Sequence, residues 1–210
     1  MSFQKALDLW WTAFPGTFIL DRQGRVTSRF FEDFYIERNT VSIIMVRLGN
    51  SDRSVAGAKA STAHLEVTTY PSDSTIAPGN RISLVLDVNP RPRMHVYAPG
   101  ASSYRVIALK LEPQPFVRTL PMKYPASQIY NFKPLNERVP VYQKPFTLVQ
   151  EVVVEGSPQA QAAFRGKDEL ILAGELEYQA CDDAICYNPA SIPLKWTLKF
   201  RSLVTERPGR

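Results

Sequence analysis

The chain has 210 residues, a formal net charge of +5, and 44% hydrophobic against 21% charged residues. This composition is typical of a globular protein with a sizeable core, and the scattered basic residues argue against a nucleic-acid partner. No apolar run approaches the ~18 residues needed to span a bilayer. Residues 1–15 lack the basic-then-apolar order of a secretory signal.

The N-terminal part of the chain predicts a β-hairpin followed by a short helix. Residues 17–20 are apolar and β-prone, residues 21–24 have the chemistry of a turn, and Val26 resumes a strand. Residues 39–40 (Asn-Thr) can cap a helix that ends at Leu48, where Gly-Asn follows.

The sequence Pro-Gly-Thr-Phe-Ile-Leu-Asp-Arg-Gln-Gly-Arg-Val at residues 15–26 resembles part of a redoxin domain of the thioredoxin-like and peroxiredoxin-like class. By this resemblance Pro15 is the cis-proline, and residues 1–49 are a partial thioredoxin-like segment without the cysteine motif of the family. We interpret the segment as a remnant; the alternative is an element that docks on the next domain. Residues 50–62 are small and polar and predict a linker.

From residue 63 the pattern changes to short strands. Residues 81–88 alternate between apolar and polar, and residues 64–70, 146–154, 169–178 and 192–201 also have strand character. The proline-rich residues 113–140 are expected to form a long irregular excursion. Seven or more short strands without a long amphipathic helix predict a mainly β fold, an antiparallel immunoglobulin-like β-sandwich over residues 63–205.

Between the last two predicted strands lies the sequence Tyr-Gln-Ala-Cys-Asp-Asp-Ala-Ile-Cys-Tyr-Asn-Pro, which holds both cysteines of the chain, Cys181 and Cys186. Thiol exchange needs a thiolate, and Asp182 and Asp183 are expected to raise the pKa of a neighbouring thiol. A partner would therefore have to change this environment on docking. A structural disulfide is the alternative, but closing so short a loop contributes only about 2 kcal/mol, which favours redox use.

Together with Met-His-Val-Tyr-Ala-Pro-Gly at residues 94–100, the cysteine stretch resembles the N-terminal domain of the thiol:disulfide interchange protein DsbD. The resemblance implies an immunoglobulin-like fold in which Cys181 and Cys186 are the catalytic pair. It also implies that a loop within residues 130–144 caps the pair until a partner docks. The residues expected to cap or shield the cysteines are Tyr142, His95, Tyr97, Tyr178 and Tyr187.

By this resemblance the chain is a protein-disulfide reductase or interchange component without a bound cofactor. It would relay reducing equivalents between a membrane electron donor and thioredoxin-like proteins, in a periplasmic or other extracytoplasmic space. Cys186 is expected to form the mixed disulfide and Cys181 to resolve it, because Cys181 directly precedes the two aspartates. Two alternatives stay open: a redox-inert immunoglobulin-like interaction domain with a structural disulfide, and a metal-binding module of both cysteines and His95, without an evident fourth ligand.

Overall fold

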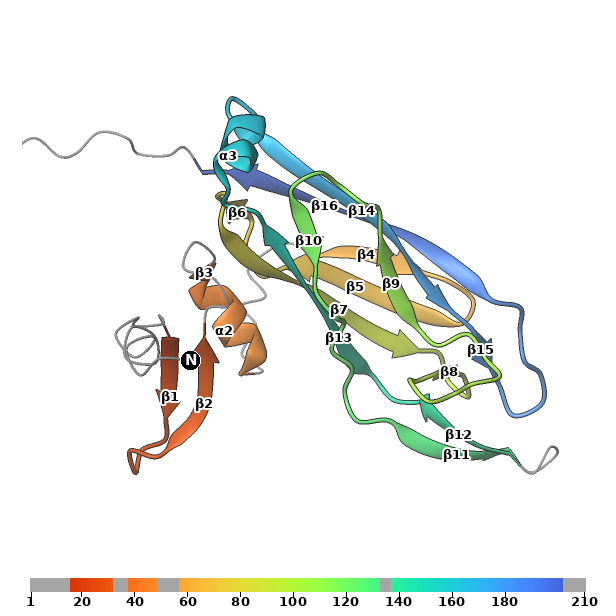
Figure 1. Cartoon of the computed structure of the whole chain (residues 1–210). Coiled ribbons are helices and arrows are strands. Elements are labelled where there is room, and N and C mark those ends of the chain that lie inside the picture. Colours follow the sequence, from red (N-terminus) through yellow and green to blue (C-terminus); the bar gives the residue numbers. More distant parts are fainter. Residues whose placement is uncertain (1–15, 32–37, 49–56, 133–136, 202–210) are drawn as a thin grey trace, which may run out of the picture.

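The computed structural model describes residues 16–31, 38–48, 57–132 and 137–201 (Figure 1). Strands β1 (Gly16–Leu20) and β2 (Val26–Phe31) form the expected antiparallel hairpin, and the Asp21 carboxylate closes its turn by accepting two backbone amide hydrogen bonds. A two-stranded hairpin is common to many folds, so it does not by itself show a thioredoxin-like domain. Pro15, predicted as a cis-proline, lies outside the described residues.

The rest of the described chain is mainly β, in three further sheets whose strands are mostly antiparallel. The first sheet has the order β10 (Val117–Thr119), β13 (Phe146–Val154), β7 (Asn80–Pro90), β5 (Leu65–Pro71) and β4 (Ala58–Ser61), with β3 (Arg38–Asn39) pairing to β7. The second has the order β6 (Thr75–Ile76), β16 (Ala190–Phe200), β14 (Glu169–Tyr178) and β9 (Ala108–Leu111). The third has the order β11 (Gln128–Phe132), β12 (Glu137–Tyr142), β8 (His95–Tyr97) and β15 (Ala180–Cys181).

The main core lies between the first and second sheets. The alternation predicted for residues 81–88 is confirmed, because the inward side chains Ile82, Leu84, Leu86 and Val88 are at most 1% exposed. Apolar side chains of β14 and β16 join the same core, and the Trp196 indole N–H donates to Thr69 Oγ1 across it (2.9 Å). Two packed sheets of this kind are consistent with the predicted immunoglobulin-like β-sandwich. No helix in the described part of the chain is long and apolar enough to cross a membrane.

The third sheet lies at one end of the sandwich (Figure 1). Its strands β11 and most of β12 come from residues 113–140, as does β10 of the first sheet. The expectation of a long irregular segment there is therefore wrong. Proline is compatible with these strands where no ladder N–H is needed. Pro140, for example, contributes its carbonyl oxygen, which accepts a hydrogen bond from the amide of Ala98 (3.0 Å).

The predicted helix is α2 (Val41–Arg47), and Thr40 is its N-cap. Thr40 Oγ1 accepts from the amide of Ile43 (3.2 Å) and donates to Asp73 Oδ2 of the sandwich (2.7 Å). The helix lies against β7, and Ile43 is fully buried. A short second helix, α3 (Pro158–Phe164), follows β13 and adds Phe164 to the main core.

Two segments before the predicted sandwich therefore join it. Residues 38–48 pack on β7, as the docking alternative expects. Strand β4 lies within the expected linker, residues 50–62, and pairs with β5 along its length. Its sequence, Ala-Lys-Ala-Ser, has no β-branched or aromatic residue, so propensity gave no sign of a strand at this sheet edge.

Candidate redox site

The two cysteines lie in residues 179–189, which connect the paired strands β14 and β16. Strand β15 within this connection pairs with β8, and Cys181 lies opposite His95. The sulfurs of Cys181 and Cys186 form a disulfide, and the two Cα atoms are 4.1 Å apart. The end of the β14–β16 hairpin is thus fixed to the third sheet.

Asp182 builds the turn between the cysteines. Its Oδ1 accepts hydrogen bonds from the amides of Ala184 (2.8 Å) and Ile185 (2.7 Å), and its Oδ2 accepts one from the Tyr187 hydroxyl (3.0 Å). The Ala184 amide, followed by that of Ile185, lowers the pKa of the Asp182 carboxyl, so this side chain is ionised near neutral pH. The carboxylate expected to act on a thiol therefore also holds the loop in shape.

The two sulfur-bearing residues differ in exposure. Cys181 is 1% exposed, whereas Cys186 is exposed on the outer side of the loop. The difference follows from pairing, since Cys181 belongs to β15 and Cys186 follows the exposed Ala184 and Ile185. A reagent from solution therefore meets Cys186 first.

Strand pairing in the third sheet decides which side chains face the disulfide. Residues directly opposite each other in a ladder share a face. Cys181 lies opposite His95, Tyr97 opposite Val141, and Tyr130 opposite Val139. All six side chains therefore belong to one face. Tyr142 lies opposite Val96, whose side chain joins the main core on the other face.

Tyr97 is the side chain in closest polar contact with the disulfide. Its hydroxyl oxygen lies 2.9 Å from Cys181 Sγ and 3.4 Å from Cys186 Sγ. Its ring stacks on Tyr104 with centroids 4.0 Å apart, and the Tyr104 hydroxyl donates to Glu137 Oε2 (2.5 Å). Burial, followed by the nearby Tyr104, raises the pKa of Tyr97, so its hydroxyl keeps its proton and can donate to sulfur.

His95 and Tyr130 form the other wall of the site. Their rings lie 4.5 Å apart, and the His95 ring meets that of Tyr97 edge-on at 5.6 Å. Burial lowers the pKa of His95, although the Asp183 carboxylate acts in the opposite direction. The net lowering favours the neutral imidazole. The Tyr130 hydroxyl donates to Asp183 Oδ1 (3.2 Å), and Arg93 pairs with the same carboxylate at 3.6 Å. These two contacts hold the Asp183 carboxylate beside the aromatic side chains.

These side chains pack around a narrow hollow beside the disulfide that has no room for a water molecule. Its lining consists of aromatic and cysteine-loop residues with one valine: His95, Tyr97, Tyr104, Tyr130, Val139, Cys181, Asp182 and Cys186. The rings of His95, Tyr97, Tyr104 and Tyr130 form an aromatic wall over the buried sulfur of Cys181, and Cys186 stays exposed.

The remaining predicted site residues lie elsewhere. Tyr142 is 4% exposed, stacks on Phe146 and donates to the carbonyl of Pro125 (2.9 Å), so it does not line the hollow. Tyr178 is buried in the main core, and its hydroxyl reaches the turn between β4 and β5. Tyr187 packs behind the cysteine loop through its bond to Asp182.

Sequence reasoning did not single out Tyr104, Tyr130 or Glu137 for this site. A signal for Tyr104 exists, because Pro-Gly at residues 99–100 predicts a turn that brings the following residues back beside Tyr97. Tyr130 and Glu137 lie within residues 130–144, the expected cap segment, but nothing distinguished them there because their strands were not predicted. In the described part of the chain, no group of three His, Cys, Asp or Glu side chains is placed to hold a metal ion.

Comparisons with known proteins identify the family and a similar fold. The family described as "Thiol:disulfide interchange protein DsbD, N-terminal" matches residues 66–193. No curated protein matches the sequence. Among solved structures, the N-terminal periplasmic domain of ScsB from Proteus mirabilis is similar in fold, with a TM-score of 0.51 and 14% identity over 68% of this chain. The match spans only about half, 51%, of that protein's chain. Since the family match covers more than half of the residues, the chain belongs to the family of DsbD N-terminal domains.

Proposed function

We propose that this chain exchanges thiols and disulfides with protein partners through Cys181 and Cys186, with Cys186 as the residue that forms the mixed disulfide. The observation that carries the proposal is the unequal exposure of the pair: Cys181 is 1% exposed and Cys186 is exposed. A structural disulfide has no need of such a difference, whereas exchange requires one reachable sulfur and one leaving group.

The chemistry balances without a cofactor. A partner thiolate attacks Cys186 Sγ, the bond between the two cysteines breaks, and Cys181 leaves as a thiolate. The Tyr97 hydroxyl, 2.9 Å from that sulfur, is in place to donate a hydrogen bond to the new charge. The second thiolate of the partner then attacks the partner's own sulfur in the mixed disulfide. The partner leaves with a disulfide, and Cys186 leaves as a thiolate that takes up a proton. In the reverse direction the Cys186 thiolate attacks a partner disulfide.

The aromatic wall would act as the shield that the family resemblance implies. Tyr130 belongs to residues 130–144, the expected cap segment, and Tyr104 would complete the shield from outside that segment. Tyr142 would support the same segment from the core side. Docking of a partner would displace part of this wall and leave the sandwich unchanged. Between encounters this wall would shield Cys181 and leave Cys186 as the sulfur that other thiols reach.

The partners are proposed to be thioredoxin-like proteins, with a membrane protein as electron donor, in the periplasm or another extracytoplasmic space. This assignment rests on membership in the DsbD N-terminal family. Residues 1–49 are proposed to derive from a redoxin domain, on the sequence resemblance of residues 15–26. In this chain the part at residues 38–48 would serve as an added cover of the sandwich.

Trapping of the mixed disulfide tests the proposal. The Cys181→Ser variant keeps the exposed sulfur and loses the resolving one, so incubation with a disulfide-bonded thioredoxin-like protein should accumulate a covalent complex. Cys186→Ser should give none, and the double variant is the control for adventitious adducts. Trapping only in Cys186→Ser would reverse the roles, and trapping in neither would leave a structural disulfide.

One observation favours that second candidate, a redox-inert interaction domain. Four aromatic side chains enclose the sulfur of Cys181, and such an enclosure would protect a permanent structural disulfide as well as it would regulate an exchanging one. The reduction potential separates the candidates, because structural disulfides have values below about −300 mV and exchanging pairs lie above this range.

A further inference from the structure

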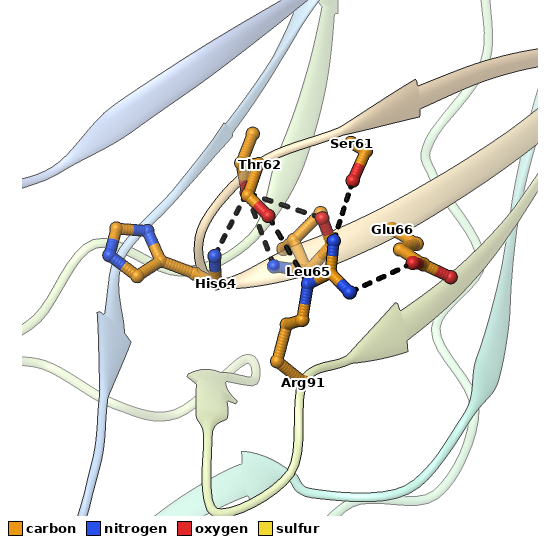
Figure 2. A network of polar contacts seen from close by, with 6 residues as sticks. All are labelled: Ser61, Thr62, His64, Leu65, Glu66 and Arg91. Atoms are coloured by element: carbon orange, nitrogen blue, oxygen red, sulfur yellow. Dashed lines mark hydrogen bonds and ion pairs between the residues drawn. The ribbon is translucent and has the colours of Figure 1, made fainter.

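The turn between β4 and β5 lies more than a hundred residues before the cysteines in sequence and contacts their loop. This turn is fixed by its own hydrogen bonds (Figure 2). Thr62 Oγ1 accepts from the amides of His64 (3.2 Å) and Leu65 (3.1 Å). The Arg91 amide donates to the carbonyl of His64 (2.8 Å), and its guanidinium reaches Ser61 Oγ (2.8 Å). Figure 2 shows the imidazole of His64 projecting away from this network.

The imidazole of His64 is held by a buried tyrosine. The Tyr178 hydroxyl donates to Thr62 Oγ1 (3.0 Å) and lies 3.3 Å from His64 Nδ1. Because the hydroxyl proton is used for Thr62, the bond to His64 requires a proton on Nδ1, which the neutral ring can carry. Tyr178 is 1% exposed, so the ring of His64 is attached to an immobile part of the core.

The other side of the imidazole contacts the cysteine loop. The His64 ring lies 4.5 Å from the ring of Tyr187, which directly follows Cys186. Tyr187 also bonds within the connection itself: its amide donates to Ala180, its carbonyl accepts from Gln179, and its hydroxyl donates to Asp182. Of these contacts, the one with His64 comes from outside residues 179–189. It ties the half of the loop that carries the exposed sulfur to the sandwich.

We propose that His64 is a positioning residue for the cysteine pair, acting through Tyr187. This inference rests on the proposed function but concerns closure of the disulfide within this chain. β15 fixes the Cys181 side of the loop by pairing with β8. The Cys186 side is held to β15 by the bond from the Tyr187 amide to Ala180, and His64 adds a ring contact that anchors Tyr187 to the sandwich.

Anchoring by His64 raises the effective concentration at which the thiol of Cys186 meets the thiol of Cys181. When both halves of the loop are anchored, less conformational entropy is lost as the sulfurs join. An aromatic pair of this kind changes an equilibrium constant by about two- to tenfold. Loss of the anchor therefore shifts the pair toward the dithiol and makes its reduction potential less negative, with tenfold equal to about 30 mV.

The test is the equilibrium constant for disulfide closure in glutathione buffers, read by alkylation of free thiols. His64→Ala should lower this constant about three- to tenfold, given the size of an aromatic contact. His64→Phe keeps a ring against Tyr187 without the Nδ1 bond and should stay within about twofold of the unchanged protein, since the proposed anchor is the ring contact. Tyr178→Phe removes the same Nδ1 bond and keeps the ring of His64, so it should also stay within about twofold.

The control is Tyr70→Phe, which removes the hydroxyl of another buried strand tyrosine, bonded to Asp87 instead of the turn. It should leave the closure constant unchanged. The inference is overturned if His64→Ala matches the unchanged protein, or if His64→Phe is as impaired as His64→Ala, with far-ultraviolet circular dichroism confirming the fold of each. Because glutathione replaces the protein partner, these results stand apart from the trapping experiment, and failure of one does not imply failure of the other.

Discussion

Replacing Tyr97 with Phe removes one hydroxyl group from the centre of the site and keeps the ring that stacks on Tyr104. The lost oxygen lies 2.9 Å from Cys181 Sγ, the sulfur proposed to leave when Cys186 is attacked. In the disulfide this sulfur is neutral, whereas after attack it is a buried thiolate. The substitution therefore acts mainly on the charged state.

The size of the effect follows from that difference. A hydrogen bond to a charged group contributes about 1.5–3 kcal/mol and one to a neutral group about 0.5–1.5 kcal/mol. The difference of roughly 1–2 kcal/mol corresponds to a rise of about one unit in the pKa of the Cys181 thiol. Part of this charge is present in the transition state, so reduction of the disulfide by dithiothreitol should slow about three- to tenfold.

Stopped-flow reduction measures the rate, and thiolate absorbance across pH in Cys186→Ser measures the pKa of Cys181. Tyr142→Phe is the matched control, because it also removes a buried tyrosine hydroxyl, bonded to the carbonyl of Pro125. This control should lose about 1 kcal/mol of stability and keep its rate of reduction. A Tyr97→Phe protein with the original rate and the original thiol pKa would refute the role given to the hydroxyl.

Two further predictions concern the loop and the N-terminal helix. The folded-state pKa of Asp182 is depressed, so its bonds contribute above the unfolded pKa near ~3.9 and are lost as pH falls through the folded pKa. Hydrogen exchange should show the Ala184 and Ile185 amides protected at pH 6 and released at strongly acidic pH, with Asp182→Asn less dependent on pH; equal protection at both would contradict this. Ile43→Ala, at a fully buried position, should lower the free energy of unfolding by about 2–4 kcal/mol in urea titrations without slowing thiol exchange; an unchanged midpoint would show that α2 adds no stability.

The strands of the main core can be predicted well from the sequence, because their apolar residues alternate over many positions. Ile82, Leu84, Leu86 and Val88 illustrate this, since these apolar residues recur with a period of two and all join the main core. The cysteine pair and its connection between two strands were also predictable, because both features are local. A helix cap at Asn39 or Thr40 was predictable for the same reason, and the structure has it at Thr40.

The shielding residues were harder to predict because they depend on pairing between distant strands. A shift of one residue moves a side chain to the other face of a sheet. Tyr142 lies opposite Val96 and faces the core, whereas Val141 lies opposite Tyr97 and faces the disulfide. No local pattern distinguishes these two registers. Prolines obscured the same region, since they reduced the strand signal of β11 and β12.

The chain order of the site also has a consequence for its assembly. Cys181 and Cys186 are only 5 residues apart, whereas the bond from Tyr97 to Cys181 spans 84 residues. Closing a loop costs more entropy as it lengthens, so the cysteines can meet before the wall encloses them. A chain made from its N-terminus completes His95, Tyr97, Tyr104 and Tyr130 before either cysteine emerges. When β15 pairs with β8 the sulfur of Cys181 is enclosed, and any later change of oxidation state starts at the exposed Cys186.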